Sequence, residues 1–272
     1  MAVYNKPLGS VILLFSSASG VGRTTLALNL ADIIKRWGMR AIAVDLDVQF
    51  GDICKFIKVE PGKTLFEYQE QLENGGADIS EYVLSGSGMP DVLAAPDTIP
   101  QALAIREKTV QVMLEQLKKE YDYIFVDTPV GFTEELLPAL RLAEEIFFVS
   151  VIDFVPTIKN ITLAYEQLKR LGVEEKKIRL ILNREQSKSA ITIENVEEII
   201  QRPFYHSLPN DFKTSNIAVK KGLPITASAP DTELAKQLEA LARKLTGQEP
   251  AEESHVHKLF SFFKSGQRGE KS

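Results

Sequence analysis

The sequence predicts an α/β fold in which a mostly parallel β-sheet is flanked by helices. Short apolar runs, each suited to one buried strand, alternate along the chain with longer segments of helical period. This alternation is typical of repeated strand–helix–strand units, which place parallel strands side by side and helices across both faces. The predicted strands are 11–15, 41–44, 123–126, 146–151, 179–182 and 204–208, and the predicted helices are 24–37, 109–120, 134–143, 157–171, 193–200 and 231–245.

Residues at the ends of these elements agree with the assignment. Gly38 and Gly172 directly follow predicted helices, where a left-handed C-terminal residue is expected. Thr192 precedes the helix 193–200 and is expected to cap its first turn. The segment 62–100 has the least regular pattern and several glycines, so we expect a short helix with loops there and a candidate partner surface.

Composition places the chain among cytoplasmic globular proteins. Its 272 residues are 44% hydrophobic and 25% charged, which is enough to bury a sizeable core. The single cysteine, Cys54, cannot form an intramolecular disulfide, and no Cys/His cluster has metal-binding spacing. No apolar run approaches the ~20 residues of a membrane span, and no secretory leader is visible. We expect one domain over 1–248, followed by a linker and tail over 249–272.

The first predicted strand leads into a loop of small residues and then into a helix. This is the context of a phosphate-binding loop, in which backbone N–H groups and the positive end of the helix face the phosphates. Gly20 and Gly22 permit close backbone approach, and the Thr24 hydroxyl stands where a Mg²⁺ ligand belongs. The match to G-x-x-x-x-G-K-[ST] is incomplete, because Ser17 and Arg23 replace its first Gly and its Lys. A tight turn that binds no ligand is the alternative.

Further segments resemble a known family. The loop is similar to the deviant Walker A pattern K-G-G-x-G-K-[ST]-[ST] of ParA/MinD ATPases, members of the SIMIBI class of P-loop proteins. AIAVDLDVQFGD at 41–52 and YIFVDTPVGF at 123–132 resemble the second motif and the Walker B region of that family. The blocks at 45–52, 126–132, 181–192 and 208–225 look like the CpaE/TadZ pilus-assembly branch. The resemblance spans about residues 10–245. It implies the three-layer P-loop NTPase fold.

The resemblance also implies a ligand, ATP or ADP with Mg²⁺, and roles for individual residues. Asp47 is the implied catalytic residue, near Mg²⁺ and the attacking water. The implied metal site comprises Thr24, Asp45, Asp47 and Asp127. The implied nucleotide-binding residues are Ser19, Gly20, Val21, Gly22, Arg23, Thr24 and Thr25 at the phosphates and Asn183, Pro209, Asn210 and Asp211 at the base.

Two departures from the family pattern bear on catalysis. In the family, the first lysine of the loop reaches the phosphates of a partner subunit, and this sequence has Ala18 there. A single cation of this kind can be worth ~10³ to 10⁵ in rate. Arg23 keeps a positive charge at the second lysine position, although its planar guanidinium does not replace a compact lysine ammonium that reaches between phosphates. We therefore expect weak or absent hydrolysis.

The residues 255–272 carry a local charge opposite to that of the whole chain. The chain has a formal net charge of −5, so we do not expect it to bind nucleic acid. The tail instead has four basic residues against one Glu. Its pattern resembles the C-terminal targeting helix of MinD-type proteins and implies reversible attachment to an acidic membrane surface; docking on the domain is the alternative. The implied membrane residues are Lys258, Leu259, Phe260, Phe262, Phe263 and Lys264.

The resemblance implies a spatial organiser that localises a pilus or secretion apparatus. Such a protein would form a homodimer when nucleotide binds, would contact proteins of that apparatus, and would be cytoplasmic or peripheral on the inner face of the cytoplasmic membrane. The alternatives are an active ATPase for division-site or flagellar placement and a nucleotide-free scaffold.

Overall fold

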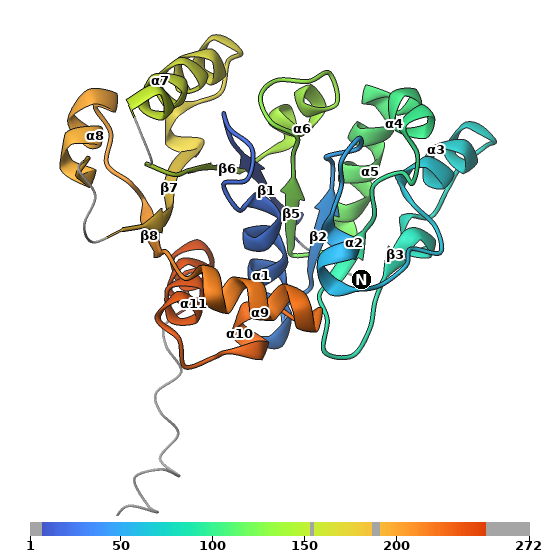
Figure 1. Cartoon of the computed structure of the whole chain (residues 1–272). Helices are drawn as coiled ribbons and strands as arrows, with labels where there is room; N and C mark the ends of the chain where they lie inside the picture. Colours follow the sequence, from blue (N-terminus) through green and yellow to red (C-terminus); the bar gives the residue numbers. More distant parts are fainter. Residues whose placement is uncertain (1–6, 153–154, 187–190, 249–272) are drawn as a thin grey trace, which may run out of the picture.

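The chain folds around an eight-stranded sheet with a layer of helices on each side (Figure 1). The computed structural model describes residues 7–152, 155–186 and 191–248. The strand order is β3-β4-β2-β5-β1-β6-β7-β8, and every neighbouring pair is parallel except β3 with β4. The strands are β1 (Ser10–Phe15), β2 (Ala41–Asp45), β3 (Val83–Leu84), β4 (Asp91–Leu93), β5 (Tyr123–Asp127), β6 (Glu145–Ser150), β7 (Ile178–Glu185) and β8 (His206–Pro209). The predicted three-layer architecture is confirmed.

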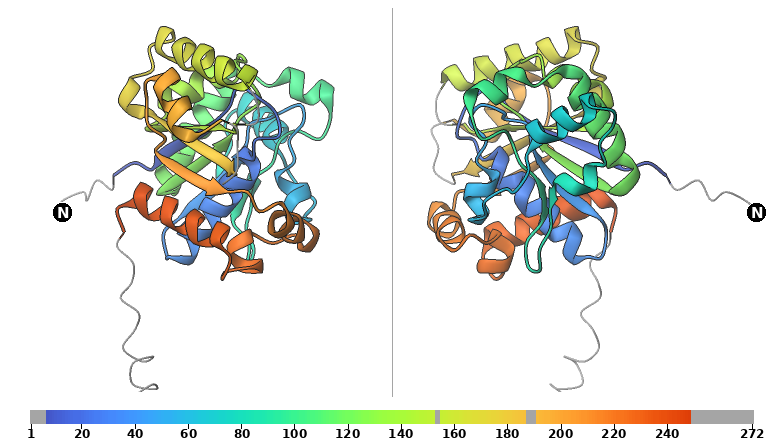
Figure 2. Two further views of the ribbon diagram at one scale, coloured as in Figure 1. Left: turned by 60° about the vertical axis from the view of Figure 1, so that its left-hand side comes forward. Right: turned by 90° about the vertical axis from the view of Figure 1, so that its right-hand side faces the viewer.

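Both faces of the central strands are buried, which explains their continuous apolar sequence. In β1, Leu13 and Phe15 pack into the core on one face, while Ile12 and Leu14 pack into the core on the other. Side chains of consecutive strand residues point to opposite faces, so an unbroken apolar run fills both cores. The turned views in Figure 2 show the sheet between its two helical layers.

Local sequence signals mark the ends of several helices, although the predicted helices do not include the segments 53–57, 212–221 and 225–228. Gly38 and Gly172 have φ angles of 84° and 87°, as predicted for residues that follow a helix. The Thr192 hydroxyl accepts the N–H of Asn195, which confirms the predicted cap. The helices are α1 (Arg23–Arg36), α2 (Ile53–Ile57), α3 (Leu65–Glu73), α4 (Ile99–Ala104), α5 (Glu107–Glu120), α6 (Leu136–Leu142), α7 (Val155–Arg170), α8 (Ile193–Ile200), α9 (Phe212–Lys221), α10 (Ile225–Ser228) and α11 (Glu233–Thr246).

The segment 62–100 is more ordered than its sequence pattern predicts, so the expectation of one short helix with loops is wrong. Two helices begin at capping boxes, formed by Thr64 and Glu67 at α3 and by Thr98 and Gln101 at α4. Between them, β3 and β4 extend the sheet. These strands of two and three residues are too short to show a period, and pairing with β2 holds β4 in place.

The topology brings the carboxyl ends of three strands together at one edge of the sheet. In the parallel register, Asp127 at the end of β5 lies opposite Leu14 of β1 and Asp45 of β2. The loop before α1 follows β1, and the carboxyl ends of such strands are where α/β sheets bind ligands. Over residues 7–152, 155–186 and 191–248, no helix combines the length and apolar character needed to span a membrane.

Candidate functional site

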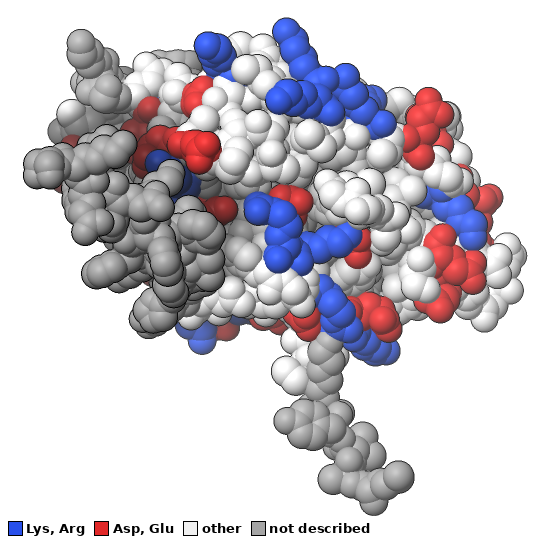
Figure 3. Space-filling model, turned by 90° about the horizontal axis from the view of Figure 1, so that it is seen from below, with Lys and Arg blue, Asp and Glu red and all other residues white. Residues whose placement is uncertain are grey.

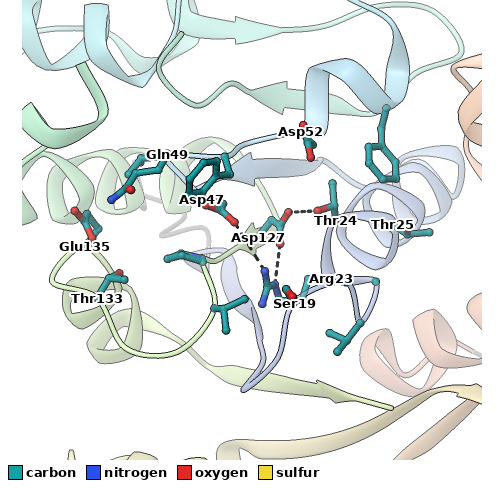
Figure 4. A pocket seen from close by; sticks show the side chains of 18 of the residues that line it. Ser19, Arg23, Thr24, Thr25, Asp47, Gln49, Asp52, Asp127, Thr133 and Glu135 are labelled. Carbon is teal, nitrogen blue, oxygen red and sulfur yellow. Dashed lines mark hydrogen bonds and ion pairs between the residues drawn. The ribbon is translucent and has the colours of Figure 1, made fainter. Parts of the chain in front are cut away.

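A cavity of about 670 Å³ lies at the carboxyl ends of β1, β2 and β5, within the range of small-molecule sites (Figure 4). All seven residues predicted for the phosphate cradle, 19–25, line it. Asp47 and Asp127 line it from the facing strand ends. The topology therefore brings residues from three separate motifs into one cavity, as the sequence blocks predict.

The loop presents unbonded backbone donors to this cavity. Gly20 and Gly22 have φ angles of 67° and 99°, and Gly22 is the N-terminal cap residue of α1. No side chain caps α1, and its first turn holds no acidic residue. The first N–H groups of a helix have no partner within the helix, so those of the first turn of α1 are available to an anion. The Ser16 hydroxyl holds the loop by bonding both the N–H and the carbonyl oxygen of Ala18.

Asn183 fixes the loop from the end of β7. Its Nδ2 donates to the Val21 carbonyl oxygen at 2.7 Å, and its Oδ1 accepts the Arg184 N–H at 2.9 Å. A Cβ atom on Gly22 would lie 2.4 Å from that Nδ2, so only glycine fits here without a shift. In this structure the amide predicted to read adenine is thus engaged with the loop.

The Arg23 side chain points toward the carboxylates of Asp47 and Asp127 (Figure 4). Its Nε lies 3.6 Å from Oδ1 of Asp127, and its Nη2 lies 3.9 Å from Oδ2 of Asp47. The other oxygen of Asp127 accepts the Thr24 hydroxyl at 2.5 Å. Arg23, Thr24, Asp47 and Asp127 therefore form one polar cluster, whose residues come from three elements.

Asp45 lies behind this cluster and does not line the cavity. It is 2% exposed, and its Oδ2 accepts the Ile53 N–H at 3.1 Å. A Cβ atom on Gly51 would lie 2.6 Å from the same oxygen, so the chain after Asp47 packs directly against this carboxylate. Asp45 therefore fixes the chain that follows Asp47 by its hydrogen bond to Ile53, and it lies next to the cavity wall without lining the cavity.

Burial shifts the acidity of all three aspartates. Burial raises the pKa of Asp127 to about 6, opposed by the Thr24 hydrogen bond and the Arg23 charge. Burial also raises the pKa of Asp47, opposed by the Arg23 charge. The pKa of Asp45 is raised well above its ordinary value by burial and by the charge of Asp127. Arg23 is the cation that the chain itself places beside Asp47 and Asp127, and its charge opposes the rise in their pKa values.

A second, smaller cavity of about 180 Å³ adjoins the first and shares Gly22, Thr25, Phe56 and Arg184 with it. It contains all four residues predicted for the base: Asn183, Pro209, Asn210 and Asp211. The Asp211 carboxylate caps α9 by accepting the Thr214 N–H at 2.9 Å. Hydrogen bonds from the Thr214 side chain and from this N–H lower the pKa of Asp211. These residues surround an apolar slot next to the loop, which suits a stacked aromatic ring.

Several residues that line the cavities were given no role from the sequence. Arg184 lines both cavities and has a φ of 55°, an uncommon conformation for a residue other than glycine. Its position directly after Asn183 is the only sequence signal. Thr133 lines the first cavity with its hydroxyl oxygen buried and unbonded. Phe50 lines the same cavity and is 72% exposed.

The donors in this cluster fit Mg²⁺, although the described residues hold no group of three or more His, Cys, Asp and Glu suited to a metal. Mg²⁺ takes oxygen ligands and usually keeps several waters, with only one or two protein carboxylates. Thr24 and Asp127 provide a hydroxyl and a carboxylate in contact at the foot of the loop. The predicted membrane residues of the tail lie outside the described residues.

Comparison with known proteins identifies the family. The family profile described as the CobQ/CobB/MinD/ParA nucleotide binding domain matches residues 12–225. The septum site-determining protein MinD of Synechocystis is 25% identical over 249 residues, which cover 89% of this chain and 91% of that protein. MinD of Helicobacter pylori is 25% identical over 252 residues, which cover 88% of this chain and 91% of that protein.

Solved structures share the fold. A ParA family ATPase from Chlorobium tepidum superposes with a TM-score of 0.78 at 22% identity, covering 88% of this chain and 99% of that one. MinD from Pyrococcus horikoshii, solved as a complex with Mg-ADP, has a TM-score of 0.75 at 21% identity, covering 88% of this chain and 96% of that one. With the profile matching most of its length, the chain belongs to the CobQ/CobB/MinD/ParA nucleotide-binding family.

Proposed function

We propose that this protein binds ATP or ADP with Mg²⁺ at the start of α1 and acts as a spatial organiser of the CpaE/TadZ kind, which localises a pilus or secretion apparatus. The observation that carries nucleotide binding is the uncapped first turn of α1, which opens with the Gly20–Gly22 loop onto the larger cavity. The Mg-ADP complex of the Pyrococcus horikoshii relative supports it. The four sequence blocks that resemble the CpaE/TadZ branch support the cellular role.

Each part of the site has a task in this proposal. The N–H groups of 19–25 bind the phosphates, and the smaller cavity, with Asn183 and Pro209, takes the base. Thr24 and Asp127 hold Mg²⁺, which when bound neutralises phosphate charge. Asp47 stands at the cavity wall and is the group that would orient an attacking water.

Hydrolysis is proposed to be weak or absent. Phosphoryl transfer depends on positioning and on cations that stabilise the charge of the transition state. Ala18 contributes no charge, and its backbone is held by Ser16. Arg23 faces two carboxylates rather than the open cavity. Replacing both residues by lysine should raise ATP turnover at least about tenfold; an unchanged turnover would contradict this explanation.

Equilibrium binding of labelled ATP with Mg²⁺ tests the central claim. We expect saturable binding by the full chain, and no measurable binding at about 1 mM nucleotide would overturn it. Gly22→Ala is the matched loop variant, because its Cβ atom would collide with the Asn183 amide. It should weaken binding, whereas Gly62→Ala, at a glycine outside the loop with nothing within 4 Å of its Cβ, should not.

The second candidate is an active MinD-type ATPase for division-site or flagellar placement. Its support is that the curated relatives from Synechocystis and Helicobacter pylori are septum site-determining proteins. Steady ATP turnover by the wild-type chain that rises with nucleotide-dependent dimerisation would favour this candidate. Light scattering with and without ATP measures the dimer in the same samples. A homodimer formed on nucleotide binding is part of both proposals.

Partners are proposed to be proteins and an acidic membrane surface. The solved MinC:MinD complex of Aquifex aeolicus supports a protein partner. The membrane contact is proposed from the tail sequence, and co-sedimentation with acidic liposomes, comparing the full chain with one ending at Glu249, tests it; equal binding would overturn it. We do not propose nucleic acid as a partner, and basic and acidic side chains are interspersed over the described part of the face in Figure 3.

A further inference from the structure

The Arg23 guanidinium occupies an unusual electrostatic position. Its side chain is only 10% exposed, yet its Nε and Nη1 atoms are buried without a hydrogen-bond partner among the described residues. Oδ1 of Asp127, which faces it at 3.6 Å, is likewise buried and unbonded. The guanidinium is therefore held by charge attraction to two carboxylates and not by a bidentate hydrogen-bonded pair.

Arg23 offsets part of the negative charge of the site. Four acidic residues, Asp47, Asp52, Asp127 and Glu135, line the cavity. Asp47 and Asp127 both face the cavity, and a nucleotide would bring further negative charge to the same place. Among the described residues that line the cavity, the basic ones are Arg23 and Arg184, and Arg184 is exposed. Without Arg23, the two aspartates would repel the phosphates across a buried space, where charge effects are screened little.

Both oxygens of Asp127 already face a partner. Oδ2 accepts the Thr24 hydroxyl, and Oδ1 faces Arg23. A divalent cation at Thr24 would share these oxygens with the guanidinium, and two cations at one buried carboxylate repel each other. The planar fork of arginine reaches Asp127 through Nε and Asp47 through Nη2 at the same time. A lysine ammonium is a compact point charge and cannot span both carboxylates in this way.

We infer that Arg23 is a built-in counter-ion for Asp47 and Asp127, which enables this site to bind ATP or ADP without Mg²⁺. The inference rests on the proposed nucleotide site and deepens it. The N–H groups of the loop and of the first turn of α1 bind the phosphates, while Arg23 offsets part of the negative charge of Asp47 and Asp127 that would otherwise repel them. Mg²⁺ and the guanidinium are then alternative partners of the same carboxylates.

Calorimetric titration of the full chain with ADP, in buffer containing Mg²⁺ and in buffer containing EDTA, tests the inference. For the wild type, we expect the dissociation constants in the two buffers to agree within about threefold. For Arg23→Lys, EDTA should weaken binding by at least about tenfold. Arg36→Lys, at the exposed end of the same helix, is the matched control and should behave as the wild type does.

The outcomes separate the inference from the proposed function. Wild-type binding that weakens about tenfold or more in EDTA overturns the inference and leaves the nucleotide site intact. No ADP binding in either buffer overturns the proposed function. The wild-type comparison stands even if Arg23→Lys does not fold. As a second readout, Mg²⁺ without nucleotide should leave the thermal midpoint of the wild type unchanged, and a clear rise in that midpoint would contradict the inference.

Discussion

The contact between Gly22 and Asn183 makes a sharp test of how the loop is held. Gly22 has a φ of 99°, outside the left-handed region open to other residues, and its Cβ would lie 2.4 Å from the Asn183 Nδ2. Gly20 has a φ of 67°, and nothing lies within 4 Å of its Cβ. The two glycines share one loop, yet they should respond differently to the same added methyl group.

The magnitudes follow from these two environments. Gly20→Ala should lower the free energy of unfolding by about 1 kcal/mol, because alanine is disfavoured in the left-handed conformation. The backbone conformation alone should make Gly22→Ala cost about 1–3 kcal/mol. This substitution also moves the Asn183 amide away from the Val21 carbonyl oxygen, which breaks a 2.7 Å hydrogen bond worth about 1 kcal/mol. We therefore expect Gly22→Ala to lower the free energy of unfolding by about 3 kcal/mol.

Urea unfolding followed by tryptophan fluorescence measures these costs. The single tryptophan, Trp37, directly follows α1, and its ring centroid lies 5.6 Å from the Cζ atom of Arg243 in α11. Its emission therefore reports on the packing of α1 against α11. In an Asn183→Ala background, Gly22→Ala should cost about 1 kcal/mol less than in the wild type, because the hydrogen bond is already absent. Equal costs for Gly20→Ala and Gly22→Ala, or strict additivity with Asn183→Ala, would show that the Asn183 amide does not constrain Gly22.

Three further substitutions probe the surroundings of the site, each by chemical unfolding. Arg23→Gln should destabilise the fold by about 3 kcal/mol, because it removes the cation that faces the buried Asp127 carboxylate. Arg106→Gln breaks an exposed ion pair with Glu73 and should cost under about 1 kcal/mol; similar losses would contradict the buried pairing. Gly51→Ala should cost about 2 kcal/mol, since its Cβ would lie 2.6 Å from the Asp45 carboxylate, and a neutral result would show that this segment can move. Burial lowers the pKa of His206 below its ordinary value of 6.5. As the pH drops through about 6.5, the unfolded chain therefore takes up a proton at this residue before the folded chain does, and the free energy of unfolding falls. The variant His206→Asn should lack this fall, and parallel curves of stability against pH for the two proteins would contradict the prediction.

Local sequence signals were sufficient for the central strands and for the loop. An apolar run such as that of β1 fills both faces of a sheet wherever the strand lies, so its identity as a strand is local information. Glycines at positive φ and a threonine at the foot of the loop are local as well. The absence of a lysine at Ala18 can be read directly from the chain, whatever its fold.

The short strands β3 and β4 could not be predicted in the same way. Two or three residues do not show a hydrophobic period, and β4 is defined by its hydrogen bonds to β2. Arg184 follows Asn183 in the chain, but only the folded structure shows that it lines both cavities.

The strand–loop–helix unit, the aspartates near the strand ends and the presence of Arg23 can all be found in the amino-acid sequence. What Arg23 faces depends on long-range packing, because Asp47 follows β2, Asp127 ends β5, and the order of strands in the sheet brings both to it. The fold also places Asn183 where it holds the loop rather than lying free. Strand order depends on long-range packing, which a local hydrophobic pattern does not encode.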